Sequence, residues 1–380
     1  MAFNFDESID RRHSDSFKWQ KYYEQNVIPL WVADTDFRSP PCIIEALQAR
    51  IAHGVFGYGF PPPELTELFI ARMDERYQWK VKPEWLVFLP GLVSGINVTV
   101  RALTGPEEGI IIPSPIYPPF RAAARSAGRP QSFAPMVLGH GRWQVDLTAV
   151  EPGLTGTEKL LMLCNPHNPG GTVYRRDELR QHLAFAQRHD LLVCSDEIHC
   201  DLLLEPGVAH IPFASLDSDA EQRSVTLMSP SKTFNIAGLG ASLAVIPNPR
   251  LRMRFIAQRS GIVPSVDVLA FVAATAAWRD GQAWLDEQLS YLRANRDWLT
   301  ARINTLPGLH MVSPEGTYLA WIDATGLAVE NPQRFFEQAG VGLSSGADFG
   351  DPRFIRLNFG CPRALLEEGV KRMTKAINAV

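Results

Sequence analysis

The sequence predicts an α/β protein with a mainly parallel central sheet and a second, smaller α+β domain. Six short apolar runs lie between about residues 84 and 246, and amphipathic segments separate them. The runs cover residues 86–88, 109–112, 160–163, 191–194, 225–228 and 242–246. None of them alternates polar with apolar residues, so we expect strands that are covered on both faces. Directly before the fourth run, Leu179, Leu183 and Ala186 recur at helical spacing. A strand, a helix and a strand in that order predict βαβ units and a parallel sheet.

The elements outside this region follow in chain order. The proline run 61–63 is typical of a turn that leads into a helix beginning near Glu64. After Pro264 a long helical stretch carries apolar residues from Trp278 to Leu299. Beyond it we expect two strands, at 318–323 and 354–359, and two helices, at 332–339 and 363–377. The pattern thus predicts a large α/β domain followed by a smaller one, and it leaves the placement of the N-terminal arm open.

Length and composition exclude several classes of protein. The 380 residues correspond to roughly two domains. The 37 basic and 41 acidic residues give a net charge of −4, which offers no footprint for nucleic acid or an anionic membrane. Five scattered cysteines without a C-x-x-C pair exclude a disulfide framework or zinc ribbon. The acidic start and the absence of a long apolar stretch lead us to expect a soluble, cytoplasmic protein.

Polar side chains follow four of the predicted strands at the point where each strand ends. In a doubly wound sheet, ligands bind beyond the carboxyl ends of the strands. The first strand leads into residues 90–95, a glycine-flanked turn that opens a helix and suits a phosphate group. The later strand ends contribute Asn168, Asp196, His199 and Lys232. Taken singly, each of these has a more ordinary role, as a turn residue, a helix cap, a buried histidine or a surface lysine.

Taken together, these residues match what pyridoxal 5′-phosphate requires. A lysine must lose its proton to form a Schiff base with the cofactor aldehyde, which burial and a neighbouring cation favour. A carboxylate must keep the pyridine nitrogen protonated, so that the ring accepts electrons. An amide must hold the phenolate oxygen, and hydroxyl and helix-start N–H groups must hold the phosphate. Lys232, Asp196 and Asn168 are the candidates for the first three tasks.

Other chemistries receive less support from the sequence. Ser229 and Lys232 form the S-x-x-K motif of serine β-lactamases, but the S-D-N and K-T-G companions of that motif are missing. The glycines at 57–59 and 238–240 fall short of a nucleotide-binding G-x-G-x-x-G. No cluster of histidine, cysteine or carboxylate residues has metal-ligand spacing, so we expect no metal.

Longer strings resemble one family. The spacing of Asn168, Asp196, Lys232 and Arg356 is similar to that of fold-type I pyridoxal-phosphate enzymes of the class I/II aminotransferase superfamily. More narrowly, the chain from residue 5 to about 373 resembles the MalY/PatB cystathionine β-lyase family. The strings that carry this resemblance are residues 10–12 (DRR), 18–19 (KW), 31–37 (WVADTDF), 165–169 (NPHNP), 195–201 (SDEIHCD), 231–235 (SKTFN) and 356–363 (RLNFGCPR).

The resemblance implies a fold-type I transferase with two domains and specific roles around the cofactor ring. The large, cofactor-binding domain would span 46–282, and the small domain would combine 1–45 with 283–380. Lys232 would bind the cofactor aldehyde and carry the proton of the substrate Cα atom. Asp196 would pair with the pyridine nitrogen, and Asn168 with the phenolate oxygen near His199. Tyr117 would stack on the ring.

The remaining implied roles concern the phosphate, the substrate and a second subunit. Arg356 would bind the substrate α-carboxylate through two parallel hydrogen bonds. Tyr58 would reach the phosphate in the neighbouring subunit's site, which implies a homodimer with shared active sites. An acid, either Tyr58, Tyr117 or the ammonium of Lys232, would protonate the departing sulfur. The phosphate itself would be held by Val93, Ser94, Ser229 and Ser231.

We therefore expect a carbon–sulfur β-lyase that converts an L-cysteine conjugate, such as L-cystathionine, into a thiol, pyruvate and ammonia. An aminotransferase is the alternative, because it needs the same lysine base and the same site residues. A purely regulatory role is a more distant alternative, and the intact Lys232, Asp196 and Arg356 argue against it. Thr35 and His13 depart from the family pattern, and they leave the leaving-group side of the substrate open.

Overall fold

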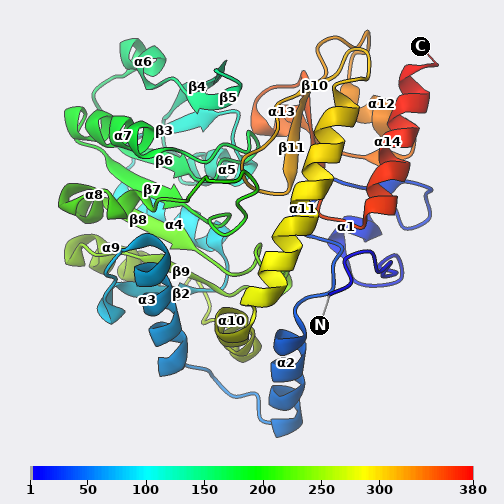
Figure 1. The fold of residues 1–380 in the computed structure, drawn as a ribbon. Coiled ribbons are helices and arrows are strands. Elements are labelled where there is room, and N and C mark those ends of the chain that lie inside the picture. The colour runs from blue at the N-terminus through cyan, green and yellow to red at the C-terminus, as the bar shows by residue number, and fades with distance from the viewer. Residues whose placement is uncertain (1–2, 380) are drawn as a thin grey trace.

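The structure is a computed structural model that describes residues 3–379, and it confirms the predicted α/β class. Its central sheet has the strand order β2-β9-β8-β7-β6-β3-β4-β5 (Figure 1). The strands are β2 (Leu86–Leu89), β3 (Gly109–Ser114), β4 (Gln131–Gly139), β5 (Arg142–Val145), β6 (Glu158–Cys164), β7 (Leu192–Asp196), β8 (Ser224–Met228) and β9 (Ser242–Val245). Strands β4, β3, β6, β7 and β8 run parallel, whereas β9 is antiparallel to β8 and β2, and β5 is antiparallel to β4. The carboxyl ends of the parallel strands therefore meet at one edge.

Helices cover both faces of this sheet, as the continuous apolar runs predict. Along β3, Ile110 and Ile112 belong to the core on one face, and Ile111 belongs to the core on the other. On the first face lie α4 (Leu92–Leu103), α5 (Pro118–Ser126) and α9 (Pro249–Arg259). The second face is covered by α3 (Pro63–Tyr77), α6 (Leu147–Val150), α7 (Arg176–Arg188), α8 (Ser218–Arg223) and α10 (Val268–Asp280). Short 3-10 turns lie at Pro83–Trp85, Glu151–Gly153, Phe213–Ser215 and Ala237–Leu239.

A second, antiparallel sheet forms the smaller part of the molecule. Its order is β10-β11-β14-β13, and β11 pairs with β14 along its whole length. The strands are β10 (His310–Met311), β11 (Leu319–Asp323), β13 (Ser344–Ser345) and β14 (Phe354–Asn358). The helices of this part are α11 (Gln282–Ile303), α12 (Pro332–Gln338), α13 (Gly346–Phe349) and α14 (Arg363–Ile377). The long α11 lies between the two parts of the molecule (Figure 1).

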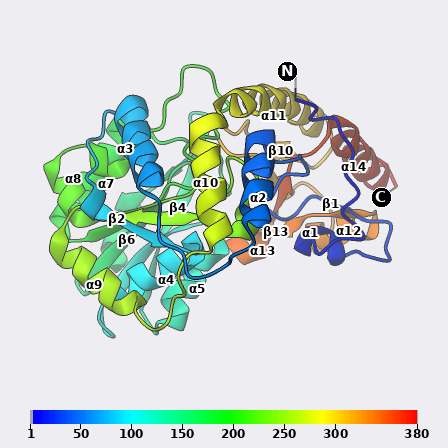
Figure 2. The same ribbon diagram turned by 90° about the horizontal axis from the view of Figure 1, so that it is seen from below.

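The N-terminal arm contacts both parts. It contains α1 (Phe17–Gln20), β1 (Ile28–Pro29) and α2 (Pro41–His53). Strand β1 pairs in parallel with β12 (Val341–Gly342) of the smaller part. Helix α2 packs beside α10 of the larger part (Figure 2). The domain limits at 45/46 and 282/283 stay a prediction, because the pairing of β1 and the packing of α2 point to different halves of the molecule.

The structure contains α2 and several short elements that were not expected, and it differs from the expected elements of the large domain in two further places. The helical stretch through Trp278 is divided at Gly281 into α10 and α11, and only glycine fits at this point, because an added Cβ would lie 2.7 Å from the Phe234 ring. The hairpin of β4 and β5 at the end of the sheet was not predicted, because these strands are half-exposed and carry no continuous apolar run. Over residues 3–379, the structure contains no helix of the length and apolar character needed to cross a membrane.

Candidate active site

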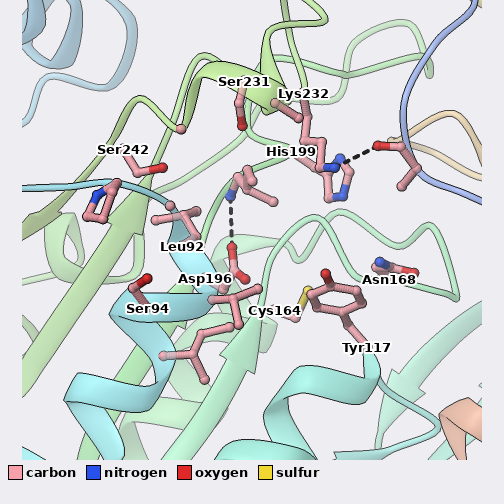
Figure 3. Close-up of a pocket in the computed structure, with 18 residues that line it drawn as sticks. Leu92, Ser94, Tyr117, Cys164, Asn168, Asp196, His199, Ser231, Lys232 and Ser242 are labelled. Carbon is pink, nitrogen blue, oxygen red and sulfur yellow. Dashed lines mark hydrogen bonds between the residues drawn. The ribbon is translucent and has the colours of Figure 1, made fainter. Parts of the chain in front are cut away.

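A cavity of about 290 Å³ lies at the sheet edge where β6, β7 and β8 end (Figure 3). It is also bordered by the segments that follow β2 and β3, by the start of the antiparallel β9 and by Ala33 of the N-terminal arm. Eight of the predicted site residues line it, namely Val93, Ser94, Tyr117, Asn168, Asp196, His199, Ser231 and Lys232. Tyr58, Ser229 and Arg356 do not line it.

Lys232 follows β8 and directs its amine toward the arm. Its Nζ donates a hydrogen bond to the Ala33 carbonyl at 2.6 Å (Figure 3). Burial lowers the pKa of Lys232 to about 8, and the charge of Arg356 acts in the same direction, whereas Asp34 and Asp196 oppose it. A lysine with this pKa is partly neutral near physiological pH, so it can attack an aldehyde or accept a proton.

Asp196 ends β7 on the opposite side of the cavity from Ser231 (Figure 3). It is 3% exposed, and it accepts a hydrogen bond from the Ile198 backbone N–H at 3.1 Å. Burial raises the pKa of Asp196 from 3.8 to about 7, and the nearby Glu197 adds to the effect. Within residues 3–379 no basic side chain forms an ion pair with it. A buried carboxylate of this kind suits a protonated ring nitrogen.

The pKa of Asp196 predicts how the stability of the cofactor-free protein depends on pH. Because the folded-state pKa is raised, stability from this group is present below pH 3.8 and is lost as the pH rises through about 7. The variant D196N removes that loss. Between pH 5 and pH 8 the wild type should therefore lose about 3 kcal/mol of its free energy of unfolding relative to D196N. Thermal or urea unfolding at both pH values measures the gap, and a gap that does not change with pH would contradict this prediction.

The other end of the cavity is a neutral cradle for an anion. Helix α4 begins here after Gly91, with no side-chain cap and no acidic residue in its first turn. Its first N–H groups and the positive end of its dipole are thus free to bind an anion. The hydroxyl-bearing residues Ser94, Ser231 and Ser242 lie around the same end (Figure 3).

Ser229 lies behind this cradle. Its Oγ donates to the Ala241 carbonyl at 2.5 Å, lies 2.8 Å from Ser231 Oγ, and accepts the Ser231 backbone N–H at 3.0 Å. Because of these bonds, the Ser229 hydroxyl contacts other protein groups and does not face the cavity. The same bonds hold Ser231 at the edge of the cavity. The structure therefore places Ser229 in a supporting position.

Arg356, on β14, contacts the cavity-lining residue Asn168. Its Nη1 donates to Asn168 Oδ1 at 3.1 Å, and its Nη2 donates to the Trp31 carbonyl at 2.7 Å. Because Arg356 occupies the oxygen of Asn168, the amide nitrogen of Asn168 is left to donate to a ligand. Burial lowers the pKa of Arg356 to about 10, and its Nε has no partner among the described residues. A buried guanidinium with only neutral partners favours an incoming carboxylate.

Tyr117 and His199 line the cavity near Asn168. The Tyr117 backbone N–H donates to the Asn168 carbonyl at 3.0 Å, and its ring lies beside Cys164 (Figure 3). Burial lowers the pKa of His199 to about 3, and the charges of Lys232 and Arg356 add to the effect. His199 is therefore neutral here, and its Nδ1 is buried without a hydrogen-bond partner among residues 3–379.

Tyr58 is placed far from the other predicted site residues. It is fully exposed, in a segment between α2 and α3, and it borders a separate surface pocket. Conversely, the sequence reasoning missed Ala33, Cys164 and Ser242. The signal for Cys164 and Ser242 was available, since Cys164 directly follows the run at 160–163 and Ser242 begins the last run. In the part of the chain that the structure describes, no group of side chains could hold a metal ion.

Comparisons with known proteins agree with this geometry. Residues 25–373 match the family described as aminotransferase class I and II. The cystathionine β-lyase PatB of Bacillus subtilis (strain 168) is 38% identical over 99% of this chain and 100% of its own length. The crystal structure of OvoB is 64% identical with a TM-score of 0.98, and all of both chains is covered. Cystalysin of Treponema denticola, whose structure contains pyridoxal 5′-phosphate, is 31% identical with a TM-score of 0.95 over all of both chains.

Pyridoxal 5′-phosphate is therefore the cofactor, and the residues in the cavity fit it. The uncapped start of α4 and three serines suit the phosphate, and the buried Asp196 carboxyl suits the pyridine nitrogen. Lys232 lies in the same cavity with an amine that loses its proton easily. The unpartnered Nδ1 of the buried His199 indicates that the cavity is built for a polar ligand.

Proposed function

We propose that this chain, which belongs to the aminotransferase class I and II family, is a carbon–sulfur β-lyase that uses pyridoxal 5′-phosphate. It would cleave an L-cysteine conjugate, such as L-cystathionine, to a thiol, pyruvate and ammonia. The observation that carries the proposal is the full-length likeness to a cystathionine β-lyase in a chain that keeps Lys232, Asp196 and Arg356 around one site.

In this proposal Arg356 and Lys232 do the work on the substrate. Arg356 binds the α-carboxylate, which supplies the anionic partner that its buried guanidinium lacks within residues 3–379. The neutral amine of Lys232 removes the proton from Cα. The cofactor, when bound, accepts the electron pair that this proton leaves behind. Asp196 favours that transfer because its carboxylate holds a proton at the pyridine nitrogen.

The second half of the reaction breaks the Cβ–S bond. The sulfur takes a proton from Tyr117, from the partner subunit's Tyr58 or from the protonated Lys232, and it leaves as a thiol. Water then hydrolyses the remaining three-carbon unit to pyruvate and ammonia. One water molecule is consumed, and no oxidant or second substrate is needed. An aminotransferase would require a keto acid to complete its cycle.

This difference gives the deciding experiment. Purified protein is mixed with L-cystathionine without any α-keto acid, and pyruvate is measured continuously. Sustained release over many turnovers is the expected result. One equivalent of keto acid per site, with turnover restored by an added keto acid, would overturn the proposal in favour of an aminotransferase. Sustained pyruvate release from other S-substituted L-cysteines alone would keep the lyase and change its conjugate.

We further propose a homodimer in which Tyr58 completes the neighbouring site. Support comes from the segment around Tyr58, which also exposes the large apolar side chains of Val55, Phe56 and Phe60. An exposed apolar group of this kind is typical of a protein contact. The fully exposed Tyr58 has no role in its own chain's cavity, so a second copy is the natural place for it.

Mixing variants tests whether the sites are shared. Y58A and K232A are each expected to be strongly impaired. In a refolded equimolar mixture, half of the dimers are mixed, and one site of each mixed dimer has both native residues. We therefore expect about a quarter of the wild-type activity to return. A mixture no more active than its components, or a particle of 42.3 kDa in light scattering, would contradict the shared site.

A further inference from the structure

We propose that Asn235 is a positioning residue that holds the N-terminal segment 31–37 against the amine of Lys232. We call residues 31–37 the strap. The inference rests on the role of Lys232 as the base in the proposed function, and that role is the same in a lyase and in an aminotransferase. It concerns a motif, residues 231–235, in which only the serine and the lysine have so far been given a task.

The strap presents its backbone carbonyls to the functional side chains of both halves of the site. The Ala33 carbonyl accepts the Lys232 Nζ bond at 2.6 Å and a second bond from the Tyr318 hydroxyl at 3.0 Å. Two residues earlier, the Trp31 carbonyl accepts the Arg356 bond at 2.7 Å. The position of this one segment therefore sets the direction in which the lysine and the arginine point.

Asn235 attaches the turn that carries Lys232 to this strap. Its Oδ1 accepts the Thr35 N–H at 3.1 Å, and its Nδ2 donates to the carbonyls of Thr35 at 3.1 Å and Phe37 at 2.8 Å. The Ser39 hydroxyl donates to the Asn235 carbonyl at 3.0 Å. Asn235 has φ 55°, in the left-handed region that asparagine tolerates better than most residues. The side-chain bonds and the backbone conformation at position 235 thus both favour asparagine.

The strap keeps other attachments when Asn235 is replaced. On its far side Asp36 is buried and accepts bonds from Arg11 and Lys18, both at 2.6 Å. Asn358 of β14 donates to the carbonyls of Val32 and Asp34. These bonds tie the strap to the arm and the smaller part, whereas Asn235 ties it to the lysine turn. Loss of Asn235 is therefore expected to release the lysine contact without unfolding the arm.

The contact has a chemical consequence for proton transfer. A carbonyl acceptor stabilises the ammonium form of the lysine, which is the form present after the Cα proton has been taken. The contact also occupies only one of the hydrogen-bonding positions of Nζ, and the other positions stay free to face the substrate. The titratable groups facing Lys232 are Asp34 of the strap, Asp196, His199 and Arg356. All of these groups remain in an Asn235 variant. Any movement of Asp34 away from Lys232 would lower the pKa of Lys232, as would the loss of the hydrogen bond to the Ala33 carbonyl.

The variant N235G tests the inference, because glycine accepts the left-handed backbone and lacks only the side-chain bonds. The matched control is N304A. Asn304 bridges backbone groups of Met311 in the same way, with bonds of 3.0 and 2.9 Å, but it lies at the end of α11. The first readout is exchange of the Cα proton of L-alanine in D₂O, measured by NMR with the holoenzyme. L-Alanine has no leaving group, so this exchange reports the removal of the Cα proton without the elimination step.

We expect exchange to fall about 10- to 100-fold in N235G and to stay unchanged in N304A, with the same cofactor absorbance in both. The second readout is competitive acetylation of Lys232 in the cofactor-free chain across pH. In N235G its midpoint should move to lower pH by about one unit, because the ammonium has lost an acceptor.

Two outcomes would overturn the inference. These are a wild-type acetylation midpoint for Lys232 in N235G, or exchange in N235G no slower than in N304A. If N235G fails to fold, N235D decides by alanine exchange alone, because it keeps the acceptor for Thr35 and loses both donated bonds, whereas its added charge would itself raise the pKa of Lys232. Exchange of alanine without pyruvate release from any cysteine conjugate would defeat the lyase proposal alone, and it would leave the role of Asn235 testable by the same readouts.

Discussion

Replacing Lys232 by alanine is expected to lower the rate of pyruvate release from L-cystathionine by at least about 10³-fold. Two functions are lost together, the covalent attachment of the cofactor and the base that takes the Cα proton. No other lysine or arginine lines the cavity within residues 3–379, and the neutral His199 is poorly basic because burial lowers its pKa to about 3. A coupled assay with lactate dehydrogenase measures the rate.

Borohydride reduction followed by mass spectrometry adds a readout that is independent of turnover. The wild-type chain should retain the reduced cofactor on the peptide that contains Lys232, and K232A should retain none. The control is K159A, since Lys159 is partly exposed and pairs with Asp190 at the opposite end of β6 from the site. Turnover in K232A within tenfold of the wild type would show that another group serves as the base.

The fold was largely predictable because buried parallel strands have a strong signal in the sequence. All six apolar runs became strands of the central sheet, and the helices expected after Glu64 and before the fourth run formed close to the expected bounds. The hairpin of β4 and β5 escaped prediction because its half-exposed strands mix polar and apolar residues. The break at Gly281 escaped prediction because the helical spacing of apolar residues continues across it, from Trp278 to Leu285.

The site was predictable where the chemistry follows directly from the sheet. Asn168, Asp196 and Lys232 were found because each ends or follows a strand, and parallel strands end at one edge. Arg356 and Tyr58 entered through the family resemblance alone, because one lies in the smaller part and the other on an exposed segment. Ala33 was missed for a similar reason. It meets Lys232 across 199 residues of chain, and no local pattern records a contact of that kind.

The variant R356A is expected to lower kcat/KM for L-cystathionine by about 100-fold or more. The physical reason is the present surroundings of Arg356. Its bonds go to Asn168, to the Trp31 carbonyl and to Ser344 Oγ, which are all neutral, and it is 4% exposed. A substrate carboxylate therefore meets a desolvated charge that no acidic side chain among residues 3–379 has neutralised. The conservative R356K should still lose about tenfold or more, because lysine cannot form two parallel bonds to a carboxylate.

A pair of substrates separates this role from simple damage to the site. S-Substituted L-cysteine and its analogue without the carboxyl group differ only in the group that Arg356 would bind. Wild-type protein should strongly prefer the carboxylate substrate, and R356A should lose most of that preference by losing activity on the carboxylate substrate alone. The matched control is R353A, since Arg353 lies three residues earlier, is exposed and pairs with Asp351. Equal losses on both substrates would mean that Arg356 supports Asn168 and the strap rather than the carboxylate. That result would move the recognition of the substrate to another part of the cavity.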